Sequence, residues 1–209
     1  MATAGEIVDA ALREGGIDAT PAQGLVWAND RYRRLVAGSK WRKLFRDIGP
    51  TVAGQSRYAI ADDVVDVLSV RVASSAPYRL ISIEELWELQ SSASVRITSR
   101  GLFAPAFDDD TNAEAVELYP APDAAGESIT ALLAVLPPAL AADDTPQIPE
   151  DYHLTGIKAG VVADGLKLID EQHSEASVWE QEFQDSIERL RRRRNSRVGR
   201  GPTAIRLLR

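Results

Sequence analysis

The hydrophobic period of this chain changes twice along its 209 residues. Up to about residue 48, and again after about residue 150, apolar side chains recur every three or four positions, as in amphipathic helices. Between these stretches the pattern is the alternation of β-strands. Because helix stripes and sheet faces must both be buried, helical segments flanking a sheet predict an α+β protein.

Capping boxes predict where the first two helices begin. Thr3 stands three residues before Glu6, and Thr20 stands three residues before Gln23. In each pair the hydroxyl can accept from a first-turn amide while the longer side chain reaches back. We expect helices over about 4–13 and 21–37, ended by Gly15–Gly16 and Gly38. The expected inward side chains are Ile7, Val8, Ala11 and Leu12, then Leu25, Trp27, Ala28, Tyr32, Leu35 and Val36.

The middle of the chain predicts strands and one short helix. Strands are expected over 55–60, 64–72, 95–98, 115–119 and 128–136. Strict alternation in 64–72 would place Val65 and Val67 on one face of the sheet. Ser82 and Glu85 form a third capping box, which predicts a short helix, and residues 101–112 are expected to form a loop.

Two further helices are expected after the proline-marked connection 141–149. The first covers 150–171 and carries apolar side chains on two faces. The second is expected to be capped by Ser174. Its inward side chains are Ala176, Trp179, Phe183, Ile187 and Leu190.

These elements predict an antiparallel four-helix bundle with an inserted small β-domain and an extended C-terminal arm. The expected boundaries are 1–49 for the N-terminal helices, 50–140 for the β insertion with its short helix, 150–196 for the C-terminal helical hairpin, and 197–209 for the arm.

Charge is divided unevenly along the chain. No acidic residue follows Glu188, and nine of the last 21 residues are arginine. The preceding residues therefore hold 15 basic against 31 acidic side chains. An acidic body with a basic tail indicates docking on a negatively charged surface, which is either a partner protein or a nucleic acid.

Signatures of catalysis are missing from the sequence. It contains no cysteine, no glycine-rich phosphate loop, no GxSxG elbow and no HExxH helix. His153 and His173 lack a metal-like partner four residues on, and the acidic run 108–110 lacks the spacing of a calcium loop. We expect no enzyme activity, no cofactor and no metal. The N-terminus has no leader-like pattern and no stretch is long enough to span a membrane, so we expect neither secretion nor membrane insertion.

The arginine run allows three interpretations. Arg191, Arg192, Arg193 and Arg194 could be a solvated helix end that complements the helix dipole. They could instead contact the phosphates of DNA or RNA, although the acidic body would repel that backbone. The third interpretation is a protein-docking arm, which we favour because apolar residues follow the run. The arm residues assigned to docking are Arg197, Arg200, Pro202, Ile205, Arg206, Leu207 and Leu208.

The order of these features resembles the head-to-tail connector or adaptor proteins of tailed bacteriophages and related prophages. The residues that carry the resemblance span about 41–153 in order, and the hairpin 154–196 is similar to the family's closing helices. Within 41–153 the segments that carry the resemblance are Trp41–Phe45, Gly54–Ile60, Val64–Val70, Val116–Pro122, Leu136–Leu140 and Ile148–His153.

The resemblance implies a structural protein of the virion, made in the cytoplasm of the bacterial host and placed at the head–tail interface. It would form a homo-oligomeric ring, commonly a dodecamer, that docks on the portal protein through the C-terminal arm. The β insertion would face the neighbouring subunits or the tail side, where a tail or stopper protein binds. DNA would pass through the lumen without specific binding, since an acidic wall repels it. The alternative is an arginine-rich nucleic-acid-binding protein.

Overall fold

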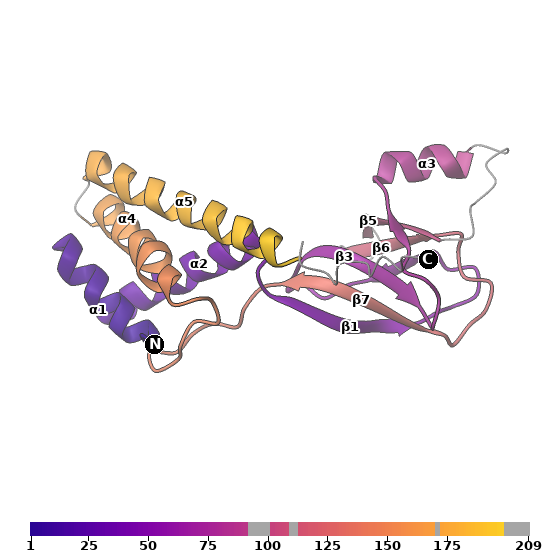
Figure 1. Cartoon of the computed structure of the whole chain (residues 1–209), viewed down its shortest axis with the longest axis horizontal. Coiled ribbons are helices and arrows are strands. Elements are labelled where there is room, and N and C mark those ends of the chain that lie inside the picture. The colour runs from indigo at the N-terminus through magenta and orange to yellow at the C-terminus, as the bar shows by residue number, and fades with distance from the viewer. Residues whose placement is uncertain (92–100, 109–112, 170–171, 199–209) are drawn as a thin grey trace, which may run out of the picture. The chain divides into compact units, whose positions relative to one another are not determined.

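The structure is a computed structural model that describes residues 1–91, 101–108, 113–169 and 172–198. The chain divides into two units. Met1–Arg42 and Leu136–Arg209 form the helical unit, and Lys43–Val135 form the β unit. Helices and sheets together confirm the predicted α+β class (Figure 1). Among the described residues, no helix combines the length and the apolar character needed to cross a membrane.

The helical unit begins with the two helices that the capping boxes predict. Helix α1 covers Ala4–Gly15 and α2 covers Pro21–Ser39. Both capping boxes form, one between Thr3 and Glu6 and the other between Thr20 and Gln23. Gly16 ends α1 in the left-handed conformation, at φ 63°. Helix α2 runs one residue past Gly38 to Ser39, and Lys40, which caps it, is also left-handed.

The predicted helix 150–171 is shorter than expected and starts with a different geometry. A π-helical turn η1 (His153–Lys158) leads into α4 (Ala159–Leu168). Leu168 and Ile169 are exposed because the chain turns there toward the last helix. The last helix, α5, covers His173–Val198, so Ser174 lies in its first turn and does not precede it.

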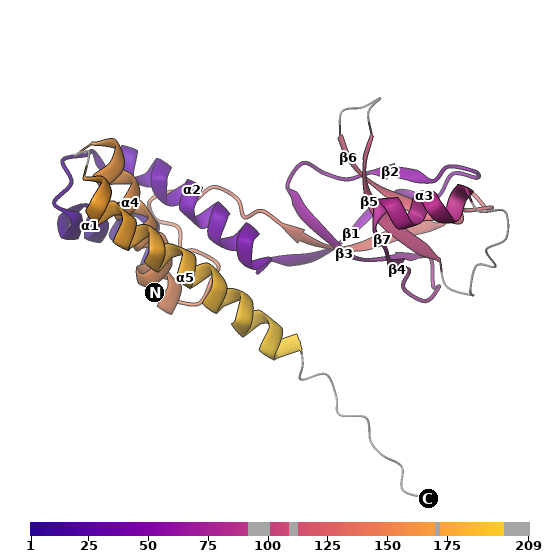
Figure 2. The ribbon, with the colours of Figure 1, turned by 90° about the horizontal axis from the view of Figure 1, so that it is seen from above.

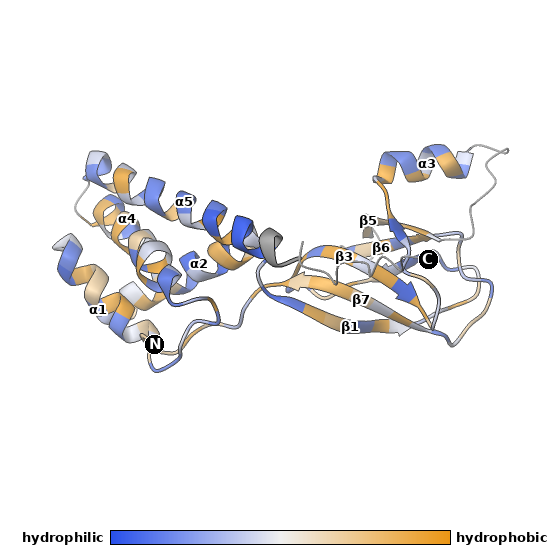
Figure 3. Ribbon diagram, viewed as in Figure 1, coloured by the Kyte–Doolittle hydropathy of each residue, from blue (hydrophilic) through white to orange (hydrophobic). Residues whose placement is uncertain are grey.

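One hydrophobic core joins α1, α2, η1, α4 and α5. In Figure 3, α4 is hydrophobic over most of its length, whereas α5 turns hydrophilic toward its C-terminal end. The two apolar faces predicted for this stretch are confirmed, since α4 contacts α1, α2 and α5. The predicted stripe of α5 is also confirmed, with Ala176, Phe183 and Leu190 buried and Trp179 and Ile187 partly buried. The antiparallel four-helix arrangement stays a prediction.

Two sheets and one helix make up the described part of the β unit. The first sheet has the order β1-β7-β3, with β1 at Lys43–Pro50, β7 at Ser128–Val135 and β3 at Val64–Val72. The second has the order β2-β6-β5-β4, with β2 at Arg57–Ala59, β6 at Ala113–Tyr119, β5 at Leu102–Asp108 and β4 at Arg79–Leu80. Helix α3 covers Ile83–Ser91 and starts at the predicted Ser82 box, where the Glu85 amide donates to the Ser82 hydroxyl. Side chains from both sheets share a core.

Three assignments in this region were wrong. Residues 43–49, placed with the N-terminal helices, form β1, and residues 102–108, placed in a loop, form β5. Both strands are held by pairing with a distant partner, β7 and β6 respectively, which the local pattern does not contain. In β3, Val65 is exposed while Val67 is buried. The register of β3 on β7 shifts between Val64 and Asp66 and again between Val67 and Ser69, and each irregularity breaks the strict alternation. The predicted strand 95–98 lies outside the described residues.

Candidate functional site

The arginine run occupies the last turns of α5. The helix continues through Arg197 and Val198, so the first two residues assigned to the extended arm are helical. Arginine is a good helix former, which favours this extension. The other arm residues assigned to docking, Arg200, Pro202, Ile205, Arg206, Leu207 and Leu208, lie outside the described residues.

Two arginines of the run bind the C-terminal end of α2. The guanidinium of Arg191 donates to the Gly38 carbonyl from Nη2 at 3.0 Å and from Nε at 3.3 Å. Arg194 donates from Nη1 to the Ser39 carbonyl at 2.9 Å. Figures 1 and 2 show the C-terminal ends of α2 and α5 on the same side of the helical unit.

This contact has a clear electrostatic reason. The last carbonyls of a helix lack intrahelical donors and carry the negative end of its dipole. The last turn of α2 contains no basic residue of its own. Arg191 and Arg194 of α5 supply the missing positive charge, and Arg191 also pairs with Glu188 at 2.8 Å. The basic helix end therefore serves first to join two helices.

The other arginines near the end of α5 differ in how many contacts they make. Arg193 lies 3.4 Å from the carboxylate of Asp151, an ion pair on the surface. Arg189 donates to the Asp185 carbonyl and the Ser186 hydroxyl. Arg192 is exposed and has no hydrogen bond or ion pair within the described part of the chain. Of the four residues assigned to the basic helix end, Arg192 is thus the one best placed to reach a partner.

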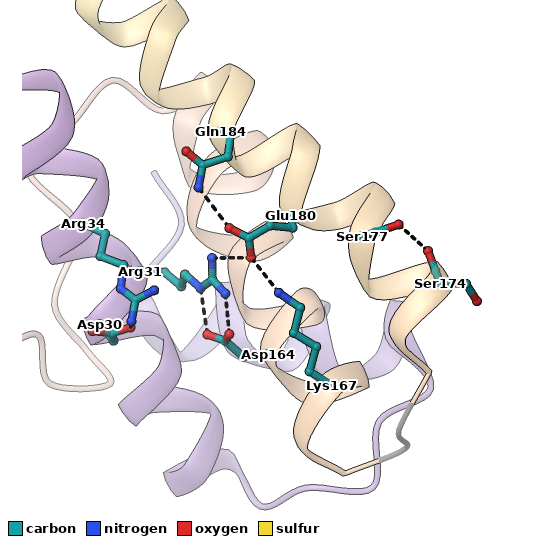
Figure 4. Close-up of polar contacts among 9 residues, drawn as sticks. All are labelled: Asp30, Arg31, Arg34, Asp164, Lys167, Ser174, Ser177, Glu180 and Gln184. Carbon is teal, nitrogen blue, oxygen red and sulfur yellow. Dashed lines mark hydrogen bonds and ion pairs between the residues drawn. The ribbon is translucent and has the colours of Figure 1, made fainter.

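A charge cluster of Arg31, Asp164 and Glu180 joins helices α2, α4 and α5. The sequence patterns did not suggest it. Arg31 on α2 is only 2% exposed. Its Nε donates to Asp164 Oδ2 on α4 at 2.7 Å, and its Nη2 contacts the other oxygen of the same carboxylate. Its Nη1 forms an ion pair with Glu180 Oε2 on α5 at 2.8 Å. Figure 4 shows the guanidinium between these two carboxylates.

The surroundings of Arg31 complete the cluster. Lys167 lies 3.2 Å from the same oxygen of Glu180, and Gln184 donates to the other oxygen at 3.0 Å. The guanidinium stacks over Phe183, 4.8 Å from the ring centroid. A Cβ at Gly160 would lie 2.6 Å from the Arg31 side chain, so glycine there makes room for it. Every charge of the cluster has an opposite partner, which is typical of a structural ion-pair network.

The cluster changes the titration of its members. Burial alone would raise the pKa of Glu180, but the hydrogen bond from Gln184, the ion pair with Arg31 and the hydrogen bond from Lys167 lower that pKa to about 2. Burial opposes the charge of Arg31, yet Asp164 and Glu180 together raise the pKa of this guanidinium. Both groups therefore stay charged at neutral pH.

Among the described residues, neither histidine belongs to a cluster of potential metal ligands. His153 is fully buried in η1, with Nε2 3.2 Å from the Ile148 carbonyl, and His173 is exposed at the start of α5. Within the described ranges, no three His, Cys, Asp or Glu side chains converge to hold a metal ion. Most of the acidic run 108–110 lies outside those ranges.

The chain is similar to a known protein family. The chain matches the model of the family described as SU10 adaptor protein over residues 2–206. No curated protein matches the chain. The match supports an adaptor-type phage protein, which is the general class that the sequence resembles.

Proposed function

We propose that this chain, which belongs to the SU10 adaptor protein family, is the structural head-to-tail adaptor of a tailed-phage virion. In this proposal copies of the chain form a ring that docks on the portal protein and joins it to the tail. The observation that carries the proposal is the extent of the family match, which covers residues 2–206 and thus both units and nearly all of the C-terminal segment. The proposed role therefore belongs to the whole chain.

The C-terminal segment is the proposed contact with the portal. After Val198 it contains three arginines, the apolar residues Ile205, Leu207 and Leu208, and no acidic residue. Arginine can steer such a segment toward an acidic rim, and the apolar residues can bury themselves in the partner. The contact of Arg191 and Arg194 with α2 supports this role, because it holds the origin of the segment on the helical unit.

The same contact weighs against the alternative of an arginine-rich nucleic-acid-binding protein. Arg191 and Arg194 already donate to carbonyl oxygens of α2, and Arg193 pairs with Asp151. Phosphate contacts would have to compete with these interactions, and the body of the chain is acidic. Protein docking by the segment after the helix requires no such competition.

The test uses a purified portal ring and two forms of the chain, the full chain and a 1–198 truncation that leaves α5 whole. We expect the full chain to bind the portal near saturation and the truncation to lose binding at least a hundredfold, as read by mass photometry at low and moderate salt. An Arg34→Ala variant of the full chain, which removes an exposed arginine of α2 that pairs with Asp30, is the control for lost positive charge and should bind within threefold of the parent.

Two results would contradict the proposal. Portal binding by the truncation would remove the docking role of the arm. Salt-sensitive binding of duplex DNA by the full chain, without any portal binding, would favour the nucleic-acid alternative, since phosphate contacts release counterions and weaken steeply with salt.

A further inference from the structure

The β unit exposes large aromatic side chains at two separate places. Phe45 on β1 is 73% exposed, and Trp87 on α3 and Phe107 on β5 are 56% and 50% exposed. In the helical unit, by contrast, Tyr32 and Phe183 are buried. Clustered exposed aromatic surface in a folded chain indicates an interaction site, because leaving it in water is unfavourable.

The first place is a groove that we name the α3 groove. It has a volume of about 550 Å³ and lies between α3, β3 and the β5–β6 pair. Its apolar lining includes Val65, Ile83, Trp87 and Phe107. A hollow of this size can enclose an aromatic side chain together with its neighbours.

The α3 wall of the groove is held in place by a polar anchor. Glu117 on β6 is buried, and its carboxylate accepts from Gln90 of α3 at 2.8 Å and from Arg57 of β2 at 2.9 Å. Leu86, the fully buried residue of α3, packs in a small core with Ile81 and Ala104 and so also holds α3 on the β unit. The groove is therefore a preformed feature of the β unit.

The rim of the α3 groove is acidic. Glu114 lines the groove and is exposed, and α3 carries Glu84, Glu85 and Glu88 with no basic residue. Asp66 also lines it. Among the described lining residues the one basic side chain, Arg57, is paired with Glu117. The groove thus suits a surface that is apolar at its centre and basic at its edge.

The second place is apolar at its centre and basic at its edge. We name it the Phe45 face, and it includes Phe45, Leu132 and Arg71. Leu44 and Ile48 pack into the core of the β unit, so Phe45 points to the opposite side of the sheet. Phe45 pairs across the sheet with Leu132, which pairs in turn with Ser69. Arg71, two residues further along β3, lines the same hollow and is exposed.

Asp47, an acidic residue of the Phe45 face, already accepts hydrogen bonds from groups of its own β unit. Asp47 accepts from the Gly49 amide at 2.9 Å and from the Ser128 hydroxyl at 2.8 Å. These bonds lower the pKa of Asp47 and tie its carboxylate to the strand end. The cation of Arg71 is left to complement an acidic partner.

We propose that the Phe45 face of one copy docks into the α3 groove of a second copy. The inference rests on the proposed function, in which copies of the chain assemble into a ring. Figure 1 shows α3 and β1 on opposite sides of the β unit, so one copy can offer both surfaces at once. Such a contact is heterologous, and each added copy leaves one face and one groove free for the next. Arg71 would meet the acidic rim while Phe45 enters between Trp87 and Phe107.

The chain has no cysteine, so introduced cysteines can report the contact by cross-linking. Ser69→Cys marks the Phe45 face and Ala106→Cys marks the groove, and neither removes an aromatic side chain. The full chain with both substitutions, treated with a short bismaleimide, should give a ladder that extends beyond dimers. Two chains that each carry one substitution, mixed together, should stop at heterodimers, because only one complete contact can be trapped.

Further variants test the side chains named in the proposal. Phe45→Ser or Trp87→Ala, added to the doubly substituted chain, should reduce cross-linking more than tenfold. Val52→Ser is the matched control, since Val52 is an exposed apolar residue of the β unit that lines neither surface, and it should leave the ladder unchanged. Far-UV circular dichroism checks that each variant is folded.

Three results would overturn the inference. The ladder could survive Phe45→Ser, or Ser69→Cys alone could give homodimers as efficiently as the mixed pair, which would indicate an isologous contact. The ladder could also be lost in the 1–198 truncation, which would show that the contact depends on the C-terminal segment. Portal binding is measured on the same variants. A ladder without portal binding contradicts the proposed function alone, and portal binding without a ladder contradicts this contact alone.

Discussion

Replacing Arg31 with methionine should destabilise the helical unit by about 3 kcal/mol. Removing one partner of a buried ion pair typically costs about 3–5 kcal/mol, because the remaining charges stay desolvated without compensation. Arg31 is 2% exposed, whereas its partners Asp164 and Glu180 are 18% and 27% exposed. Water can therefore reach the two carboxylates in part, and the lower end of that range applies. Methionine keeps an unbranched side chain over Phe183, so little packing is lost.

The assay is urea unfolding followed by far-UV circular dichroism. Of the described helices, α3 alone lies in the β unit, so the signal reports mainly on the helical unit. With a denaturant slope of about 2 kcal/mol per molar urea, a loss of about 3 kcal/mol moves the midpoint down by about 1.5 M. An Asp30→Asn variant is the control. It breaks the exposed Asp30–Arg34 pair, and such pairs contribute at most about 0.5 kcal/mol.

A triple variant separates the charge effect from damage to packing. Adding Asp164→Leu and Glu180→Met to Arg31→Met replaces all three buried charges with apolar groups, which is often neutral or stabilising. Most of the lost stability should then return. The reasoning is refuted if Arg31→Met shifts the midpoint no more than Asp30→Asn does, or if the triple variant is less stable than the single one.

Three other perturbations have outcomes that follow from the same contacts. Lowering the pH should destabilise the helical unit: the pKa of Glu180 lies near 2 in the folded chain against an ordinary 4.5, so its contribution is complete above about pH 5 and is lost as the pH falls toward 2. Thermal melts of the parent and of Glu180→Gln between pH 6 and pH 2 check this, and an equally steep pH dependence in the variant would count against it. Gly160→Ala should cost about 1–3 kcal/mol, because the new methyl group would lie 2.6 Å from an Arg31 side chain that its ion pairs prevent from moving. Urea midpoints test this in the parent and in an Arg31→Ala background, where the effect should largely disappear. Thr20→Ala should lower the stability of the helical unit by about 1 kcal/mol, because it removes the hydroxyl that accepts from the backbone amide of Gln23. An unchanged urea midpoint would show that this cap does not stabilise the unit.

The sequence by itself predicted the features that arise from neighbours along the chain. The capping boxes at Thr3 and Thr20 join residues three positions apart and form where the sequence places them, and the Ser82 hydroxyl accepts from the Glu85 backbone amide at the start of α3. The apolar stripe of α5 likewise depends on a repeat within one helix. The resemblance to phage adaptor proteins, which the family match supports at the level of an adaptor-type protein, also depended on motifs in sequence order.

What only the tertiary structure decided involves residues far apart in the chain. Strands β1 and β5 exist because β7 and β6 pair with them, and irregular pairing in β3 moves Val65 out of the core. Arg31 meets Asp164 across 133 positions, and Arg194 meets the Ser39 carbonyl across 155. None of the three interpretations of the arginine run included what Arg191 and Arg194 do, which is to donate to the last carbonyls of another helix. Local periodicity carries no information about which distant group will face a side chain, and the free energy of such contacts arises only when packing brings the partners together and excludes water.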